Sequence, residues 1–125
     1  MLIEAPLYTW VYKFYNSNMA GIFLTKQFGQ GQLAGAKATL YTCPASTTAI
    51  IKSITLTNTD SSARTVNLYV STGTSRRVIP KSLTLGVGDT YEYDLVTTLE
   101  ATHLIEGDAS VANVIDYVIS GIQET

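Results

Sequence analysis

Side chains suited to nucleophilic chemistry are scarce in this sequence. Its 125 residues include one cysteine, Cys43, and one histidine, His103, which lie far apart in the chain. A hydrolytic nucleophile needs a base beside it, and the Gly-x-Ser-x-Gly turn of the α/β-hydrolases is absent from the sequence. We interpret Cys43 as a small buried hydrophobe and His103 as a solvated or structurally hydrogen-bonded residue. One Cys and one His also exclude a structural zinc site, so we expect no enzyme, no metal and no cofactor.

The acidic residues offer two further kinds of chemistry. Glycoside hydrolysis uses two carboxylates, and the available acids are Glu92, Asp94, Glu100 and Glu106. Calcium prefers hard oxygen ligands on turns, which here would be Asp89, Glu106 and Asp108. Alternating acids on a strand usually form only its solvent-facing side, and the spacing of these residues matches no calcium loop. The sequence therefore favours a non-catalytic surface over either site.

The elements that would position these residues are strands. Between residues 50 and 70 apolar side chains alternate with polar ones, so that Ile54 and Leu56 share a side with Ile50. The alternation resumes at Val66, after the polar interval 58–62. Because successive strand side chains point to opposite faces, and Asn, Asp and Ser favour turns, this stretch predicts a β-hairpin. It also predicts an antiparallel sheet that is covered on one side.

Shorter stretches with the same pattern predict further strands at residues 22–28, 37–42, 76–79, 82–85, 90–95 and 113–122. The glycine-rich stretch 29–35 is interpreted as a flexible connection, and 86–89 and 106–108 as turns. Residues 95–103 have room for one helical turn at most. About eight short strands without a convincing helix predict an all-β fold, an antiparallel β-sandwich of jelly-roll-like or immunoglobulin-like type.

Composition limits the possible partners. The charged fraction is only 14%, which fits a surface that packs against neighbours and equally fits an ordinary β domain. All eight Lys and Arg residues precede residue 82, and eight of the ten acids follow it, so the two parts carry +6 and −8. We favour strands of both parts interleaving in the sheets over a basic face that meets an acidic face of another subunit. Scattered basic residues argue against nucleic acid, and the absence of a long apolar run or signal peptide argues against a membrane.

Residues 1–18 form a segment of their own. Residues 7–15 read LYTWVYKFY, and the four aromatic side chains on one parity are Tyr8, Trp10, Tyr12 and Phe14. This pattern predicts a strand with an aromatic ladder, which must be covered. It fits a first core strand, an arm that adds to a neighbouring subunit, or a stretch upstream of the true start at Met19. We favour an arm or a non-core extension at residues 1–18 that precedes a domain at residues 19–125, with partner contacts from these four aromatics and from Arg76 and Arg77.

Three stretches resemble a known group of proteins. They are residues 39–45 (TLYTCPA), 50–60 (IIKSITLTNTD) and 83–95 with its Gly-x-Gly-Asp-Thr-Tyr-Glu turn. From about Ala20 onward the chain resembles small virion structural proteins of tailed bacteriophages and prophages. The resemblance implies a head decoration, or cement, protein on the outer surface of the phage head. Such a protein is made in the host cytoplasm, binds the major capsid protein, forms a trimer or dimer, and has no catalytic residues.

Two functions from different classes follow. In the first, the chain is an assembly part that covers seams between shell subunits. In the second, it is a tail or fibre module that binds host-surface glycans on exposed aromatics such as Tyr69 or Tyr91. The apolar parity of Tyr91 favours core packing, whereas Tyr69 falls on the polar side of its predicted strand.

Overall fold

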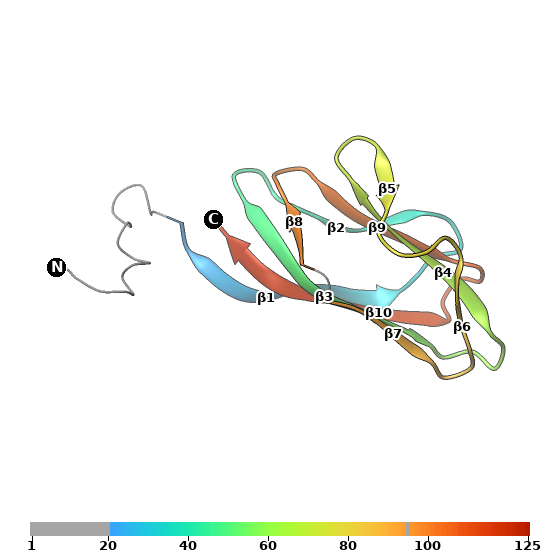
Figure 1. Ribbon diagram of the computed structural model, residues 1–125. Coiled ribbons are helices and arrows are strands. Elements are labelled where there is room, and N and C mark those ends of the chain that lie inside the picture. Colours follow the sequence, from blue (N-terminus) through green and yellow to red (C-terminus); the bar gives the residue numbers. More distant parts are fainter. Residues whose placement is uncertain (1–20, 95) are drawn as a thin grey trace.

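The computed structural model describes residues 21–94 and 96–125, and it confirms an all-β sandwich (Figure 1). Sheet A contains, in order, β1 (Phe23–Gln32), β10 (Ile115–Glu124), β3 (Thr48–Asn58) and β7 (Thr90–Tyr93), with β8 (Thr97–Leu99) also paired to β3. Sheet B contains, in order, β2 (Ala38–Thr42), β9 (Leu104–Ala109), β4 (Arg64–Ser71) and β5 (Ser75–Arg77), with β6 (Leu83–Leu85) also paired to β4. All pairs are antiparallel. Within these ranges we find no helix that could cross a membrane.

The strand order is that of a jelly roll. β5 and β6 share one side of β4, and β7 and β8 share one side of β3, so each couple takes the place of a single strand. Most consecutive strands then lie in opposite sheets, and each sheet alternates early with late strands. An immunoglobulin-type sandwich instead pairs its first two strands within one sheet. Of the two predicted types, the jelly roll therefore agrees with the structure.

The predicted hairpin between residues 50 and 70 is wrong, although both of its strands exist. β3 belongs to sheet A and β4 to sheet B, so the connection at 59–63 crosses from one sheet to the other. Alternation reports which face of a strand is buried, and both strands bury a face in the same core, but it does not report the partner. The tight hairpin joins β4 to β5, where Gly73 has a φ of +116°.

A β-bulge also changes the predicted parity of β3. The register with β10 shifts where Ser53 faces Ser120 and Ile51 faces Gly121, which leaves Lys52 unpaired. As a result Ile51 is buried on the same side as Ile54, while Ile50 is only half-buried. The extra residue reverses the inward and outward positions on either side of it.

The predicted turn at 106–108 and the first part of the predicted connection, residues 29–32, are strands instead, whereas residues 33–35 do lie in the connection between β1 and β2. β1 continues through Gly29 and Gly31, and a Cβ on Gly31 would lie 3.4 Å from the Tyr117 ring. β9 continues through Gly107, where a Cβ would lie 3.1 Å from the Asn67 carbonyl oxygen. These glycines allow close approach within the sandwich rather than a turn. The segment 95–103 contains β8 and no helical turn in its described residues, whereas Gly88, with a φ of +76°, confirms the turn at 86–89.

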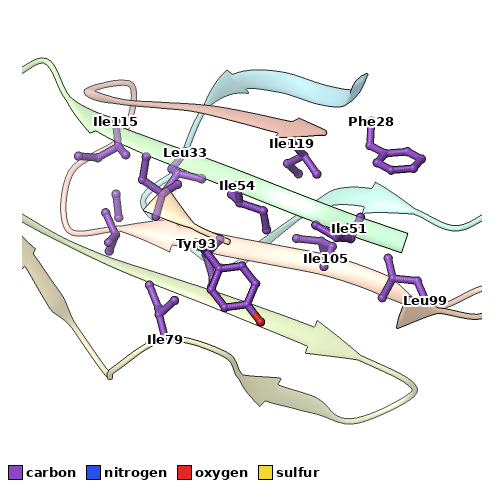
Figure 2. Close-up of a cluster of buried hydrophobic side chains, with 14 of the residues drawn as sticks. Phe28, Leu33, Ile51, Ile54, Ile79, Tyr93, Leu99, Ile105, Ile115 and Ile119 are labelled. Carbon is purple, nitrogen blue, oxygen red and sulfur yellow. The ribbon is translucent and has the colours of Figure 1, made fainter. Parts of the chain in front are cut away.

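The core lies between the two sheets. The side chains labelled in Figure 2 come from both sheets and from the connections between them, and they share one interior. Val66 and Leu68 are fully buried, as the alternation predicts, and Tyr93 is buried while Tyr91 packs at the margin of the core. Because this core is closed, the surfaces that remain for binding are the outer faces of the two sheets and their open edges.

Candidate interaction surface

The side chains of Cys43 and His103 do not form a catalytic pair. The structure does bring their backbones together, since the Cys43 N–H donates to the His103 carbonyl at 2.9 Å. The Cys43 thiol, however, donates to the carbonyls of Thr47 at 3.3 Å and Leu99 at 3.6 Å. The His103 Nδ1 accepts from the Glu100 N–H at 3.2 Å. Burial raises the pKa of the Cys43 thiol, which keeps it protonated and weakly nucleophilic.

The acids considered for calcium lie in different places. Asp89 closes the turn before β7, where its carboxylate accepts from the Gly86 N–H at 3.0 Å. Glu106 and Asp108 lie on β9, at the outer face of sheet B. Across residues 21–94 and 96–125, no three His, Cys, Asp or Glu side chains gather closely enough to hold a metal ion.

Tyr69 is the centre of a polar cluster on the outer face of sheet B, which we call the Tyr69 network. Tyr69 is only 9% exposed, and Lys37 Nζ lies 5.0 Å and Arg77 Cζ 5.1 Å from its ring centroid. Its hydroxyl donates to Asp108 Oδ2 at 2.9 Å. Burial and the neighbouring Asp108 raise the pKa of Tyr69. A ring covered by two cations is not open for stacking against a sugar, so Tyr69 does not support the glycan-binding hypothesis.

The same network links the basic first part of the chain to the acidic last part. Lys37 Nζ donates to Ser75 Oγ at 2.9 Å, and Ser75 Oγ donates to Glu106 Oε1 at 2.5 Å. Asn67 accepts from Arg77 and donates to Asp108 at 2.8 Å. The predicted interleaving of the two parts in the sheets is thus confirmed. In this network neutral side chains connect basic residues to acidic ones: Ser75 lies between Lys37 and Glu106, and Asn67 lies between Arg77 and Asp108. We therefore assign the Tyr69 network a role in holding β2, β4, β5 and β9 together.

The predicted partner residues do not form one patch. Arg77 belongs to the Tyr69 network, whereas Arg76 lies opposite Val70 on the other parity of β5 and is exposed. Strand alternation separates two arginines that are adjacent in sequence. Tyr8, Trp10, Tyr12 and Phe14, and the proposed domain boundary at residue 18, lie outside the described residues. Their role stays a prediction.

The open edge of sheet A is a candidate surface that the sequence interpretation missed. Ile22 and Thr125 exchange two backbone hydrogen bonds, of 3.0 and 3.1 Å, next to the first pair of β1 with β10. In an antiparallel pair such exchanges recur at every second residue, so Phe23, Thr25 and Gln27 direct their N–H and C=O groups away from β10. In the part of the chain that the structure describes, β1 pairs with no other strand. We call residues 22–27 the β1 edge.

The β1 edge is apolar on both of its faces. Ile22, Phe23 and Leu24 are 59%, 58% and 53% exposed. Phe28, four residues further along the same strand, is instead buried against Tyr41 with ring centroids 4.6 Å apart. Figure 1 shows β1 beginning beside the end of β10 at the margin of the sandwich. Large exposed apolar side chains on an open strand favour pairing with another chain. The signal in the sequence is that residues 22–24 are apolar on both parities, so one core face cannot cover them.

Tyr41 gives the fold a predictable response to alkaline pH. Burial, with a smaller contribution from the nearby Cys43 thiol, raises the pKa of Tyr41 from 10.0 to about 12, and its buried hydroxyl makes no hydrogen bond with the described residues. The folded state holds this proton more tightly than the unfolded state. The resulting stabilisation is complete below pH 10 and is lost as the pH rises towards 12.

We therefore expect the urea midpoint of the wild-type chain to fall as the pH rises above 10. The Tyr41→Phe variant should show a shallower fall, since Tyr69 still contributes, and should match or exceed the wild type at pH 7 because a buried unpaired hydroxyl is removed. Urea titrations followed by circular dichroism at several pH values measure both effects. Identical slopes for the two chains would contradict the assignment to Tyr41.

Comparison with known proteins gives fold-level similarity only. No family model matches the chain, and no curated protein matches it. A structure from Bacillus endospore appendages, described as disulfide-linked pili, is 14% identical with a TM-score of 0.47, over 84% of this chain and 88% of that one.

Two further similarities are to virus and phage structures. An infectious bursal disease virus structure (Gx strain) is 11% identical with a TM-score of 0.48, and it covers 83% of this chain but 32% of the viral one. A pentameric capsid protein from metagenomic phage sequences is 15% identical with a TM-score of 0.44, over 97% and 77%. With identities this low and all TM-scores below 0.5, these similarities carry no functional conclusion for this chain.

Proposed function

We propose that this protein is a structural component of a bacteriophage particle, a decoration protein that binds the major shell protein and stabilises the head. The observation that carries the proposal is the β1 edge. There, within residues 21–94 and 96–125, a domain with a closed core leaves three large apolar side chains exposed and a row of backbone groups without a strand partner. The resemblance of residues 39–45, 50–60 and 83–95 to small virion structural proteins supports the same role. The low charged fraction of 14% suits a molecule surrounded by neighbours.

The mechanism would be burial of surface along the joints between shell subunits. Apolar area removed from water contributes about 25 cal/mol per Å², from which the costs of association are subtracted. The jelly-roll core supplies a rigid body, and the β1 edge supplies backbone groups that a neighbouring strand can pair with. Residues 1–18 would add contacts through their aromatic side chains, and the exposed Arg76 is available to an acidic partner.

Counting the copies of the chain in the particle tests this function. Quantitative mass spectrometry of purified virions should give a copy number comparable to that of the major shell protein, because a brace is needed at every joint. Peptides from the shell protein and from a tail protein in the same digest provide the internal references. A copy number close to that of the tail protein would place the chain in the tail, and its absence from virions would refute the proposal altogether.

A further inference from the structure

We propose that the β1 edge is the docking strand for residues 7–15 of a second copy of this chain, which would extend sheet A by strand exchange. This inference rests on the proposed function and deepens it, because it names the partner of the edge.

The backbone of the β1 edge calls for an extended partner. Phe23, Thr25 and Gln27 present N–H and C=O groups that β10 does not use, and such groups are satisfied by strand addition. The nine residues 7–15 contain no proline and no glycine, and their alternating pattern predicts a strand. They are long enough to pair along the whole of residues 22–27.

The side chains of the β1 edge call for a partner that is apolar on both faces. Lys26 lies opposite Gly121, which lies opposite the buried Ile51, so the parity of Lys26 is the core side of the sheet. Leu24 and Ile22 share that side, and Phe23 lies on the other, because residues opposite each other in a sheet share a face. The edge therefore exposes apolar groups on both of its faces.

The segment 7–15 provides both faces. Its even positions carry Tyr8, Trp10, Tyr12 and Phe14, and its odd positions include Leu7, Val11 and Tyr15. With the even positions on the core side, the aromatic ladder would cover Ile22 and Leu24 and continue the Phe28–Tyr41 contact. Aromatic and aliphatic neighbours across two strands are a favourable pairing.

The other edges of the sandwich are less suited to docking. β2 has five residues and a register shift between Thr39 and Tyr41. The edge formed by β5 and β6 is interrupted around Pro80, and the edge formed by β7 and β8 is interrupted between Tyr93 and Thr97. β1, with ten residues, is the longest edge strand among those the structure describes.

The position of the segment in the chain favours exchange between copies. Only residues 16–20 separate it from Gly21, where the described chain begins. Such a short connection promotes domain swapping, in which one copy supplies to another the contacts that it could make itself. On a particle surface the copies lie close together, and the high effective concentration favours the exchanged form.

Mixing two variants that each carry one added cysteine beside the native Cys43 tests this inference on the purified 125-residue chain, without virions. One chain carries Thr25→Cys, and the other, with a different mass tag, carries Thr9→Cys, Val11→Cys or Lys13→Cys. Thr25 is exposed, so its substitution leaves the core intact, and the native Cys43 is buried and common to both chains. Mild oxidation followed by intact-mass analysis should show a disulfide-linked heterodimer for one of the three pairs. The matched control, Thr98→Cys on the exposed side of β8, should give none.

The same analysis separates the alternatives. When both cysteines are placed on one chain, a disulfide closed within the monomer would overturn the assignment to a second copy. A heterodimer that forms equally well with Thr98→Cys, or no heterodimer at all, would overturn it as well. Deleting residues 1–18 should convert a self-associating chain to a monomer by light scattering. If this inference fails while the virion copy number stays high, the proposed function still stands.

Discussion

Replacing Asn58 with Ala is expected to lower the free energy of unfolding by about 2–4 kcal/mol, because the side chain links three segments of backbone. Asn58 ends β3 and is 1% exposed. Its Nδ2 donates to the carbonyls of Ser62 at 2.9 Å, Leu85 at 3.0 Å and Gly86 at 3.1 Å. Its Oδ1 accepts from the Asp60 N–H at 2.9 Å.

The size of this effect follows from what the substitution leaves behind. Alanine would leave the buried hydrogen bond to the Leu85 carbonyl and the part-buried ones to Ser62 and Gly86 unmade, and each orphaned buried group costs about 1–3 kcal/mol. The side chain also holds the β3–β4 connection against the turn at 86–89, so its loss frees the crossing between the two sheets. Asn58→Asp should be at least as damaging, because a carboxylate cannot donate to the three carbonyls.

Urea unfolding at pH 7 measures both variants. Thr57→Ala is the matched control, since its hydroxyl makes a single, exposed hydrogen bond of 2.9 Å with that of Thr90. We expect this control to change the free energy of unfolding by less than about 1 kcal/mol, with an unchanged denaturant slope in all chains. If Asn58→Ala behaves like the control, the side chain does not hold this corner together.

The connection between β3 and β4, which Asn58 holds in place, also shows what sequence patterns can and cannot predict. Apolar residues alternate with polar ones around Ile54 and Leu56, and again around Val66 and Leu68. This pattern correctly identifies two strands and the faces they bury. The same alternation is produced whether two strands pair with each other or face each other across a core. The pairing of β3 with β10, about sixty residues later, depends on the whole topology and has no local signal.

Glycines in strands illustrate a second limit. A glycine between polar residues usually indicates a turn, and this led to the wrong interpretation of residues 29–32 and 106–108. At Gly31 and Gly107 the cause is a neighbour from elsewhere in the fold, the Tyr117 ring and the Asn67 carbonyl. Because the neighbour comes from a distant part of the chain, the local sequence cannot distinguish close packing from a turn.

The candidate surface was only partly predictable for the same reason. Arg76 and Arg77 are adjacent in the sequence, but β5 separates them and places Arg77 in the Tyr69 network. Tyr69 lies on the outer face as predicted, yet Lys37 comes from a distant segment to cover it. The β1 edge, in contrast, has a local signal in Ile22, Phe23 and Leu24. Apolar residues at both even and odd positions indicate a strand that has to bury both of its faces.

Replacing Gly121 with Ala is expected to lower the free energy of unfolding by about 2–4 kcal/mol, because the position has no room for a methyl group. An ideal Cβ there would lie 2.0 Å from the Ile50 carbonyl oxygen and 2.9 Å from the Phe28 ring. Gly121 pairs with Lys26 on one side and with Ile51 on the other, at the bulge of β3. The backbone oxygen cannot rotate away as a side chain would, so β3 must move away from β10.

Gly35→Ala provides the matched control, since a Cβ there meets its nearest atom, the Ala112 nitrogen, at an ordinary 3.8 Å. This control should leave the free energy of unfolding unchanged or raise it by up to about 1 kcal/mol, because alanine restricts the unfolded chain. Urea midpoints for both variants give the comparison directly, and equal midpoints would contradict the packing argument. The consequence extends to assembly, because β10 is the strand that pairs with β1 among the residues that the structure describes. A β10 displaced at Gly121 distorts the β1 edge, so Gly121→Ala should weaken self-association even at temperatures where the domain stays folded, while Gly35→Ala should not.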